Sequence, residues 1–132
     1  MNNDNKNIID LSREYFYKGY LCQMRGKYDD AIKNYEKSID VYPTAEAFTF
    51  LGWTYSFKGD LERAIEKCKN AIDLDPDYGN PYNDIGAYLM QQGNVDEAIT
   101  WLELAINSKR YENGEFAHLN LGKALEMKGL WF

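Results

Sequence analysis

The chain has 132 residues, of which 45% are hydrophobic and 27% charged, so we expect a globular domain with its own core. Its 15 Lys and Arg against 21 Asp and Glu give a net charge of −6, which argues against binding to nucleic acid or to anionic lipid. The two cysteines, Cys22 and Cys68, are far apart in sequence, which excludes a disulfide scaffold, and with one histidine they are too few for a Cys/His zinc site. The sequence shows neither a secretory signal nor an apolar run of membrane-spanning length, so we expect a cytoplasmic protein.

Small residues recur along the chain at a nearly constant interval. One glycine series has spacings of 33, 34 and 36 residues and comprises Gly19, Gly52, Gly86 and Gly122. A second series lies seven residues further on and comprises Gly26, Gly59, Gly93 and Gly129. Alanines follow in the same phase at Ala31, Ala64 and Ala98, and prolines at Pro43 and Pro76. Markers that keep one phase indicate an internal repeat of about 34 residues.

Each repeat is predicted to contain two helices. Around the first glycine, apolar residues fall at helical spacing, as in Phe48, Leu51 and Tyr55. The second glycine is typical of a helix end, and an amphipathic stretch with acidic residues in its first turn follows it. We expect helices over residues 9–25, 28–41, 44–57, 61–74, 80–91, 95–108 and 114–128. Residues 1–7 are polar and are expected to be disordered.

This pattern resembles the tetratricopeptide repeat, whose signature is W-x2-L-G-x2-Y, then A-x3-F, then P. The second unit matches it best, with Phe48-x2-Leu51-Gly52-x2-Tyr55, Ala64-x3-Cys68 and Pro76, whereas the third has Arg110 where proline belongs. The resemblance implies an all-α, right-handed helical-repeat solenoid of about three and a half antiparallel helix pairs. The expected layout is a polar tail and helix start over 1–11, then a repeat domain over 12–132 with units 12–44, 45–78, 79–112 and a partial unit 113–132.

No set of residues in the sequence points to catalysis, so we expect no enzyme activity, no cofactor and no metal site. His118 falls on the apolar stripe of the last predicted helix and is expected to be a partly buried packing residue. Cys22 and Cys68 fall on similar stripes, which favours small buried side chains over reactive thiols.

The family resemblance implies that the first helix of each repeat lines a concave groove, in which we expect a protein or peptide partner to bind. Aromatic side chains would give the partner flat apolar area, and asparagines would hydrogen-bond its backbone. The predicted binding residues are Phe16, Tyr20, Trp53, Phe57, Asn83, Met90 and Asn120. An alternative stays open, in which these aromatic residues bridge adjacent repeats and belong to the core.

The family's best-known ligand mode is a clamp of Lys, Arg and Asn for the C-terminal carboxylate of chaperone tails. The corresponding positions hold Phe16, Tyr20, Phe50, Asn80 and Asp84. They supply no cation, and Asp84 would repel a carboxylate, so we do not expect a chaperone tail as the partner.

The last predicted helix and the residues after it are apolar, with Leu125, Trp131 and Phe132 among them. Because a solenoid needs polar ends, two interpretations follow. The chain is a fragment or regulatory domain of a larger protein, or this face is buried by self-association, for example in a homodimer. The sequence therefore predicts an interaction scaffold, with a self-assembling structural module as the alternative.

Overall fold

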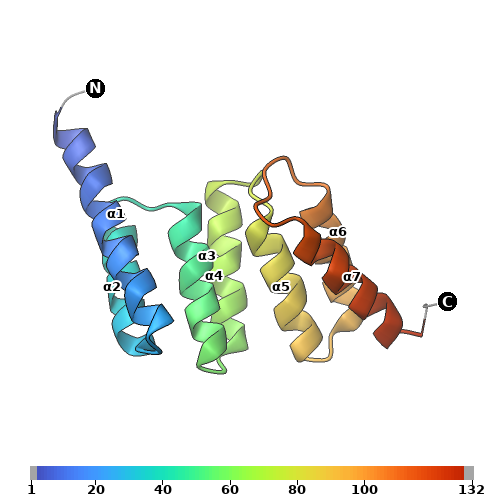
Figure 1. The fold of residues 1–132 in the computed structure, drawn as a ribbon. Helices are drawn as coiled ribbons and strands as arrows, with labels where there is room; N and C mark the ends of the chain where they lie inside the picture. Colours follow the sequence, from blue (N-terminus) through green and yellow to red (C-terminus); the bar gives the residue numbers. More distant parts are fainter. Residues whose placement is uncertain (1–2, 130–132) are drawn as a thin grey trace. The chain divides into compact units, whose positions relative to one another are not determined.

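The computed structural model describes residues 3–129, and this part of the chain forms seven α-helices (Figure 1). Within it the only pairing of strand type is an isolated bridge between Tyr78 and Arg110. The helices are α1 (Asn3–Met24), α2 (Tyr28–Val41), α3 (Ala45–Phe57), α4 (Leu61–Leu74), α5 (Asn80–Gln91), α6 (Val95–Ile106) and α7 (Glu115–Met127).

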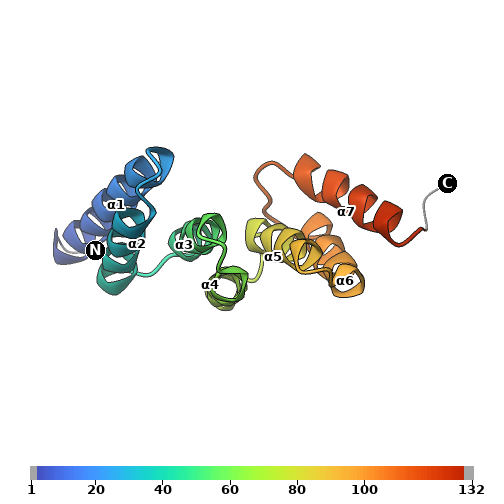
Figure 2. The same ribbon diagram turned by 90° about the horizontal axis from the view of Figure 1, so that it is seen from below.

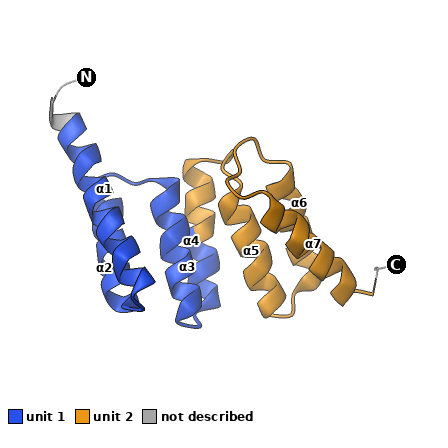
Figure 3. Ribbon diagram, viewed as in Figure 1, with its two compact units in different colours: residues 1–67 blue, residues 68–132 orange. Residues whose placement is uncertain are grey.

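The chain divides into two compact units, residues 1–67 and residues 68–132, with the boundary inside α4 (Figure 3). In unit 1, α1 packs against α2, and both contact α3. In unit 2, α5 packs against α6, α6 packs against α7, and α5 also touches α7 (Figure 2). Each unit therefore contains an antiparallel helix pair with the first helix of the next repeat beside it.

The second glycine series ends helices as the sequence indicates. Gly26, Gly59, Gly93 and Gly129 all have positive φ, between 74° and 86°. At the first of these turns the N–H of Lys27 donates to the carbonyl of Cys22 over 2.9 Å, across the glycine. Glycine reaches this conformation without Cβ strain, so the predicted helix ends are confirmed.

The first glycine series marks close helix crossings at two of the positions that the structure describes. A Cβ added to Gly19 would lie 2.8 Å from the ring of Tyr35, and one added to Gly86 would lie 2.6 Å from Leu102. Each contact joins the first helix of a repeat to the second. Gly122 marks no such crossing, since an added Cβ would meet no described atom within 4 Å.

Two predicted boundaries are wrong. Helix α1 begins at Asn3, so the expected disorder does not hold for residues 3–7, and residues 1–2 lie outside the described part. No glycine or proline interrupts this polar segment, and each residue added to an existing helix gains a backbone hydrogen bond. Helix α6 ends at Ile106 instead of residue 108, with Asn107 as its C-cap.

Candidate functional site

Seven aromatic rings of unit 1 form a connected cluster on α1, α2 and α3. Ring centroids are 5.1 Å apart for Phe16 and Phe50, 5.8 Å for Phe50 and Trp53, and 5.2 Å for Trp53 and Phe57. Edge and tilted contacts at these separations are favourable for aromatic rings. The members of this aromatic cluster are Phe16, Tyr20, Tyr28, Tyr35, Phe50, Trp53 and Phe57.

The aromatic cluster has a buried end and an exposed end. Tyr35 is fully buried, and burial raises the pKa of its hydroxyl, which donates a 2.6 Å hydrogen bond to Oε1 of Gln23. At the other end Phe57 is 50% exposed and stacks on Tyr28 with the rings nearly parallel, 5.4 Å apart. Trp53 lies between them and is half-buried. The cluster therefore packs α1 against α3 and also presents aromatic area to solvent.

This arrangement divides the four predicted aromatic residues between two roles. Phe16 bridges α1 and α3 through its contact with Phe50. This agrees with the alternative in which the aromatic residues bridge adjacent repeats and belong to the core. Tyr20 also contacts Phe50, at 6.1 Å, but stays half-buried. Trp53 and Phe57 lie toward the open end. The sequence analysis considered Phe50 only as a position of the carboxylate clamp, whereas the structure makes it the ring that joins most of the others.

A pocket of about 260 Å³ lies beside the aromatic cluster in unit 1. Its walls are lined by Arg13 and Phe16 of α1 and by Glu46 of α3. Ser12 and Ser38 also line the pocket. The two serines are buried and hydrogen-bond each other, with 3.0 Å between their hydroxyl oxygens, so that side of the pocket is rigid and internally satisfied. Sequence reasoning missed this pocket, because its lining residues come from three helices.

In unit 2 the predicted asparagines bind each other. Nδ2 of Asn120 on α7 donates to Oδ1 of Asn83 on α5 over 3.0 Å, and Asn83 is only 8% exposed. The pair therefore joins the two helices, and those two atoms are already occupied. Met90, the third predicted residue of this unit, is half-buried near the other end of α5.

Asp84 lies next to Asn83 on α5. Burial of its carboxyl raises the pKa to about 7, and a hydrogen bond from the Asn83 side chain only partly offsets this. Within the part of the chain that the structure describes, no Lys, Arg or His lies within 4 Å of this carboxyl.

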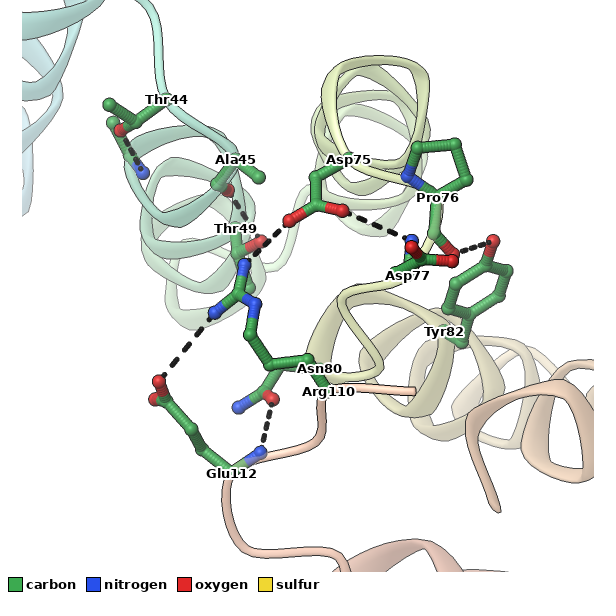
Figure 4. Close-up of polar contacts among 11 residues, drawn as sticks. Thr44, Ala45, Thr49, Asp75, Pro76, Asp77, Asn80, Tyr82, Arg110 and Glu112 are labelled. Carbon is green, nitrogen blue, oxygen red and sulfur yellow. Dashed lines mark hydrogen bonds and ion pairs between the residues drawn. The ribbon is translucent and has the colours of Figure 1, made fainter. Parts of the chain in front are cut away.

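Arg110 organises the two loops of unit 2. Nη2 of Arg110 donates to Oδ2 of Asp75 over 2.7 Å, and Nη1 lies 3.8 Å from Oε1 of Glu112 (Figure 4). The backbone of Arg110 also pairs with the α4–α5 loop, through Gly79 N–H at 2.7 Å and Asp77 C=O at 2.9 Å. The ion pair lowers the pKa of Asp75 below its ordinary value. We call this set of contacts the loop clasp.

The remaining reactive side chains form no metal-binding group among the described residues. No group of three His, Cys, Asp or Glu is placed to hold a metal there. Cys68 is fully buried, and burial raises the pKa of its thiol, while Cys22 is half-buried. The expectation for His118 is wrong, because it is exposed on α7. No described helix is long and apolar enough to cross a membrane.

The predicted self-association residues lie on and beyond α7. Leu125 is half-buried, and Trp131 and Phe132 lie outside the described residues. Three other large apolar side chains of this helix, Phe116, Leu119 and Met127, are each more than half exposed. The exposed apolar area of α7 thus lies mainly at residues that the prediction did not select.

Helix pairs closed by a glycine turn and crossing at small residues define a helical-repeat protein. Models of the tetratricopeptide repeat match residues 12–44 and 58–119, so the chain belongs to the tetratricopeptide repeat family.

The chain is similar to several curated proteins over part of their length. It is 28% identical over 102 residues to the photosystem I assembly protein Ycf3 of Prochlorococcus marinus, a match that covers 69% of this chain and 59% of that protein. It is 34% identical over 99 residues to the human mitochondrial import receptor subunit TOM70, covering 74% of this chain and 16% of that protein. The chain thus spans about three fifths of the length of Ycf3 and much less of TOM70.

Solved structures share the fold. The first tetratricopeptide domain of Spaghetti (RPAP3), bound to the HSP90 peptide SRMEEVD, has a TM-score of 0.81 at 24% identity, covering 91% of this chain and 94% of that one. MamA has a TM-score of 0.78 at 28% identity, covering 90% and 69%. These likenesses establish an all-α helical-repeat solenoid fold.

Proposed function

We propose that this protein is an interaction scaffold that captures a peptide or a helix of a partner protein on the open end of the aromatic cluster. The observation that carries the proposal is the half-exposed ring of Phe57, continuous with the half-buried indole of Trp53. Rigid aromatic side chains give much contact area for little loss of conformational entropy, which is why they are common at binding hot spots.

The pocket beside the aromatic cluster supports the same proposal. Its walls carry Phe16 together with Arg13, so it offers one apolar and one cationic contact to a partner side chain. The acidic HSP90 peptide of the RPAP3 structure is a poor model for the partner of this chain. The positions of the family's carboxylate clamp that lie in unit 1, Phe16, Tyr20 and Phe50, supply no cation for such a peptide.

The test is affinity capture with the full chain, followed by direct binding to the captured partner. A Trp53→Ala/Phe57→Ala variant removes the open end of the aromatic cluster. Tyr42→Ala serves as the matched control, because Tyr42 is an exposed aromatic residue outside the cluster. We expect the control to bind like the unaltered chain and the double variant to lose at least tenfold in affinity with unchanged helicity. Equal binding by all three proteins would refute the proposal.

A second candidate function is self-assembly through α7. The exposed side chains of Phe116, Leu119 and Met127, and the open space beside Gly122, favour it. The mass of the chain in solution, measured by light scattering, would then exceed 15.4 kDa, and Leu119→Glu would return it to the monomer value. A monomer at all concentrations would exclude this candidate.

A further inference from the structure

The loop between α6 and α7 contains Asn113 followed by Gly114, the only Asn-Gly pair in the sequence. Asn113 is exposed and has a φ of 65°, and among the described residues it is the only one other than glycine with a positive φ. Asparagine tolerates this left-handed conformation better than most residues do, because its side chain is short and polar. The turn into α7 therefore favours asparagine at a position that is open to solvent.

The two groups that react when an asparagine loses its amide are both unrestrained here. Among the described residues, the side-chain amide of Asn113 makes no hydrogen bond, and the N–H of Gly114 donates none. The carbonyl of Asn113 accepts a bond from the N–H of Phe116 over 3.1 Å, which holds the first turn of α7 but leaves the Asn113 side chain free. A Cβ built on Gly114 would meet only the ring of Tyr111, at 3.8 Å, so no side chain shields the Gly114 nitrogen closely.

From this arrangement we propose that Asn113 is a site of spontaneous deamidation, which forms aspartate and isoaspartate. The Gly114 nitrogen gives its proton to hydroxide or a buffer base and attacks Cγ of Asn113, forming an N–Cγ bond. The Cγ–Nδ2 bond breaks, and the nitrogen leaves as ammonia with a proton taken back from solvent. Water then opens the resulting succinimide ring. Attack of water at Cγ gives aspartate and attack at the main-chain carbonyl carbon gives isoaspartate, with no oxidant or reductant involved.

A second asparagine of the same loop region is restrained at both groups. Asn107 precedes Ser108, which is also a small residue. Nδ2 of Asn107 donates to the carbonyl of Glu103 over 2.9 Å, and the N–H of Ser108 donates to the carbonyl of Ala105 over 3.1 Å. The leaving group and the attacking nitrogen are thus both engaged, so we expect Asn107 to stay unmodified while Asn113 reacts.

The isoaspartyl product changes the connection to α7. Its main chain runs through the former side chain, so the link from residue 113 to Gly114 is longer by one CH2 group, and the former carbonyl becomes part of a free carboxylate. On the other side of this link the loop is fixed, because the N–H of Glu112 donates to Oδ1 of Asn80 over 3.1 Å. The longer link therefore has to be accommodated at the start of α7, and we expect this helix to loosen from α5.

The aspartate product has a milder effect. It keeps the original main chain, and aspartate tolerates a positive φ as asparagine does, so α7 stays in place with one more negative charge before its first turn. The Asn-Gly pair would thus act as a slow covalent switch on α7 whose isoaspartyl form is the active one. This inference goes beyond the proposed function, which concerns the aromatic cluster of unit 1.

The first experiment incubates the full chain in mildly alkaline buffer beside a free peptide of residues 111–123. Peptide mapping with fragmentation locates a mass gain of one unit, and protein L-isoaspartyl methyltransferase labels the isoaspartyl form. We expect the gain at Asn113 at comparable rates in the chain and the peptide, no gain at Asn107, and a slower reaction in mildly acidic buffer. Reaction of the peptide without reaction of the folded chain, or equal rates at Asn107 and Asn113, would overturn the proposal.

Two matched glycine variants complete the design. Gly114→Ala adds a methyl that fits without a clash but crowds the attacking nitrogen, so it should slow the reaction at Asn113. Gly122→Ala, which also has room for a methyl but lies within α7, should react like the unaltered chain. An equal rate in Gly114→Ala would refute the role of the Gly114 nitrogen.

Hydrogen exchange of the separated products tests the effect on α7. The amides of α7 should exchange faster in the isoaspartyl product than in the aspartate product or the unaltered chain, while those of α1–α3 stay the same. Equal exchange of α7 in all three forms would contradict the switch. None of these results depends on the aromatic cluster, so the proposed function is tested separately by Trp53→Ala/Phe57→Ala.

Discussion

The guanidinium of Arg110 lies 4.1 Å from the ring centroid of Tyr78, so that a cation stacks on a tyrosine that is only 1% exposed. Arg110 occupies the repeat position at which the first two units have Pro43 and Pro76. Proline shapes a loop by fixing φ, whereas arginine here holds the loop through the ion pair with Asp75 and the stacking on Tyr78. The contacts of Arg110 thus take the place of the proline that the family pattern has at this position.

We therefore expect Arg110→Ala to destabilise unit 2. The cation–π contact and the partly exposed ion pair together contribute about 1–2 kcal/mol, which chemical denaturation would measure as a lower midpoint. Lys109→Ala is the control, because Lys109 is the exposed neighbour and makes no contact in the loop clasp. Equal midpoints for the two variants would show that the loop clasp does not stabilise the unit.

The repeat made most of the fold predictable from sequence. The glycine that ends the first helix of each repeat and the small residues at the crossings of Gly19 and Gly86 are local requirements. They recur in phase, so each unit strengthened the prediction for the others. The end of α6 was not predictable in this way. There the chain has Arg110 instead of proline, and the loop conformation depends on Asp75 and Tyr78, more than thirty residues earlier.

The candidate site was less predictable than the fold. Helical spacing placed Phe16, Trp53 and Asn83 on the first helices of their repeats, but it does not say which side chains meet. Asn120 hydrogen-bonds Asn83, and Phe50 lies at the centre of the aromatic cluster. Both arrangements depend on contacts between helices, which helical spacing does not specify. The burial of the Asp84 carboxyl likewise depends on packing between elements, which helical spacing does not specify.

Gly86 and Gly122 offer a matched test of helix crossing. Gly86→Ala would place a methyl 2.6 Å from Leu102 and should cost about 1–3 kcal/mol of unfolding free energy. Gly122→Ala meets no described atom and should stabilise α7 by about 0.5–1 kcal/mol through helix propensity. Urea denaturation of both variants measures the difference.

The sign of the Gly122→Ala effect also tests self-assembly. If a second copy packed its helix against Gly122 as Leu102 packs against Gly86, the added methyl would destabilise the protein and lower its mass in solution. A stabilised, monomeric Gly122→Ala variant would instead show that this face is open to solvent.

The hydrogen bond from Tyr35 to Gln23 should stabilise unit 1. Tyr35→Phe would leave Oε1 of the buried Gln23 without its donor, at a cost of about 1–2 kcal/mol. Tyr15→Phe is the control, because its hydroxyl makes no described hydrogen bond and the ring beneath Lys18 and Lys37 is kept. A Tyr35→Phe variant as stable as Tyr15→Phe would mean that the Gln23 amide is satisfied in another way.

Asp84→Asn should stabilise the protein in a pH-dependent manner. The folded-state pKa of Asp84, about 7, lies above the ordinary value of an unfolded aspartate, so the folded chain binds the extra proton between about pH 4 and pH 7. The contribution of Asp84 to the unfolding free energy therefore falls as pH rises through this window, and the full penalty is present above it. Replacing the carboxyl by an amide removes the penalty.

The unfolding free energy of Asp84→Asn, measured against that of the unaltered chain, should be on the order of 1–4 kcal/mol higher at pH 8 and about equal at pH 4. Glu103→Gln, which changes an exposed acidic group, should show little difference at either pH. A constant effect of Asp84→Asn across the whole range would mean that the carboxyl ionises normally in the folded chain. The desolvation of the Asp84 carboxyl would then be too weak to hold a proton at neutral pH.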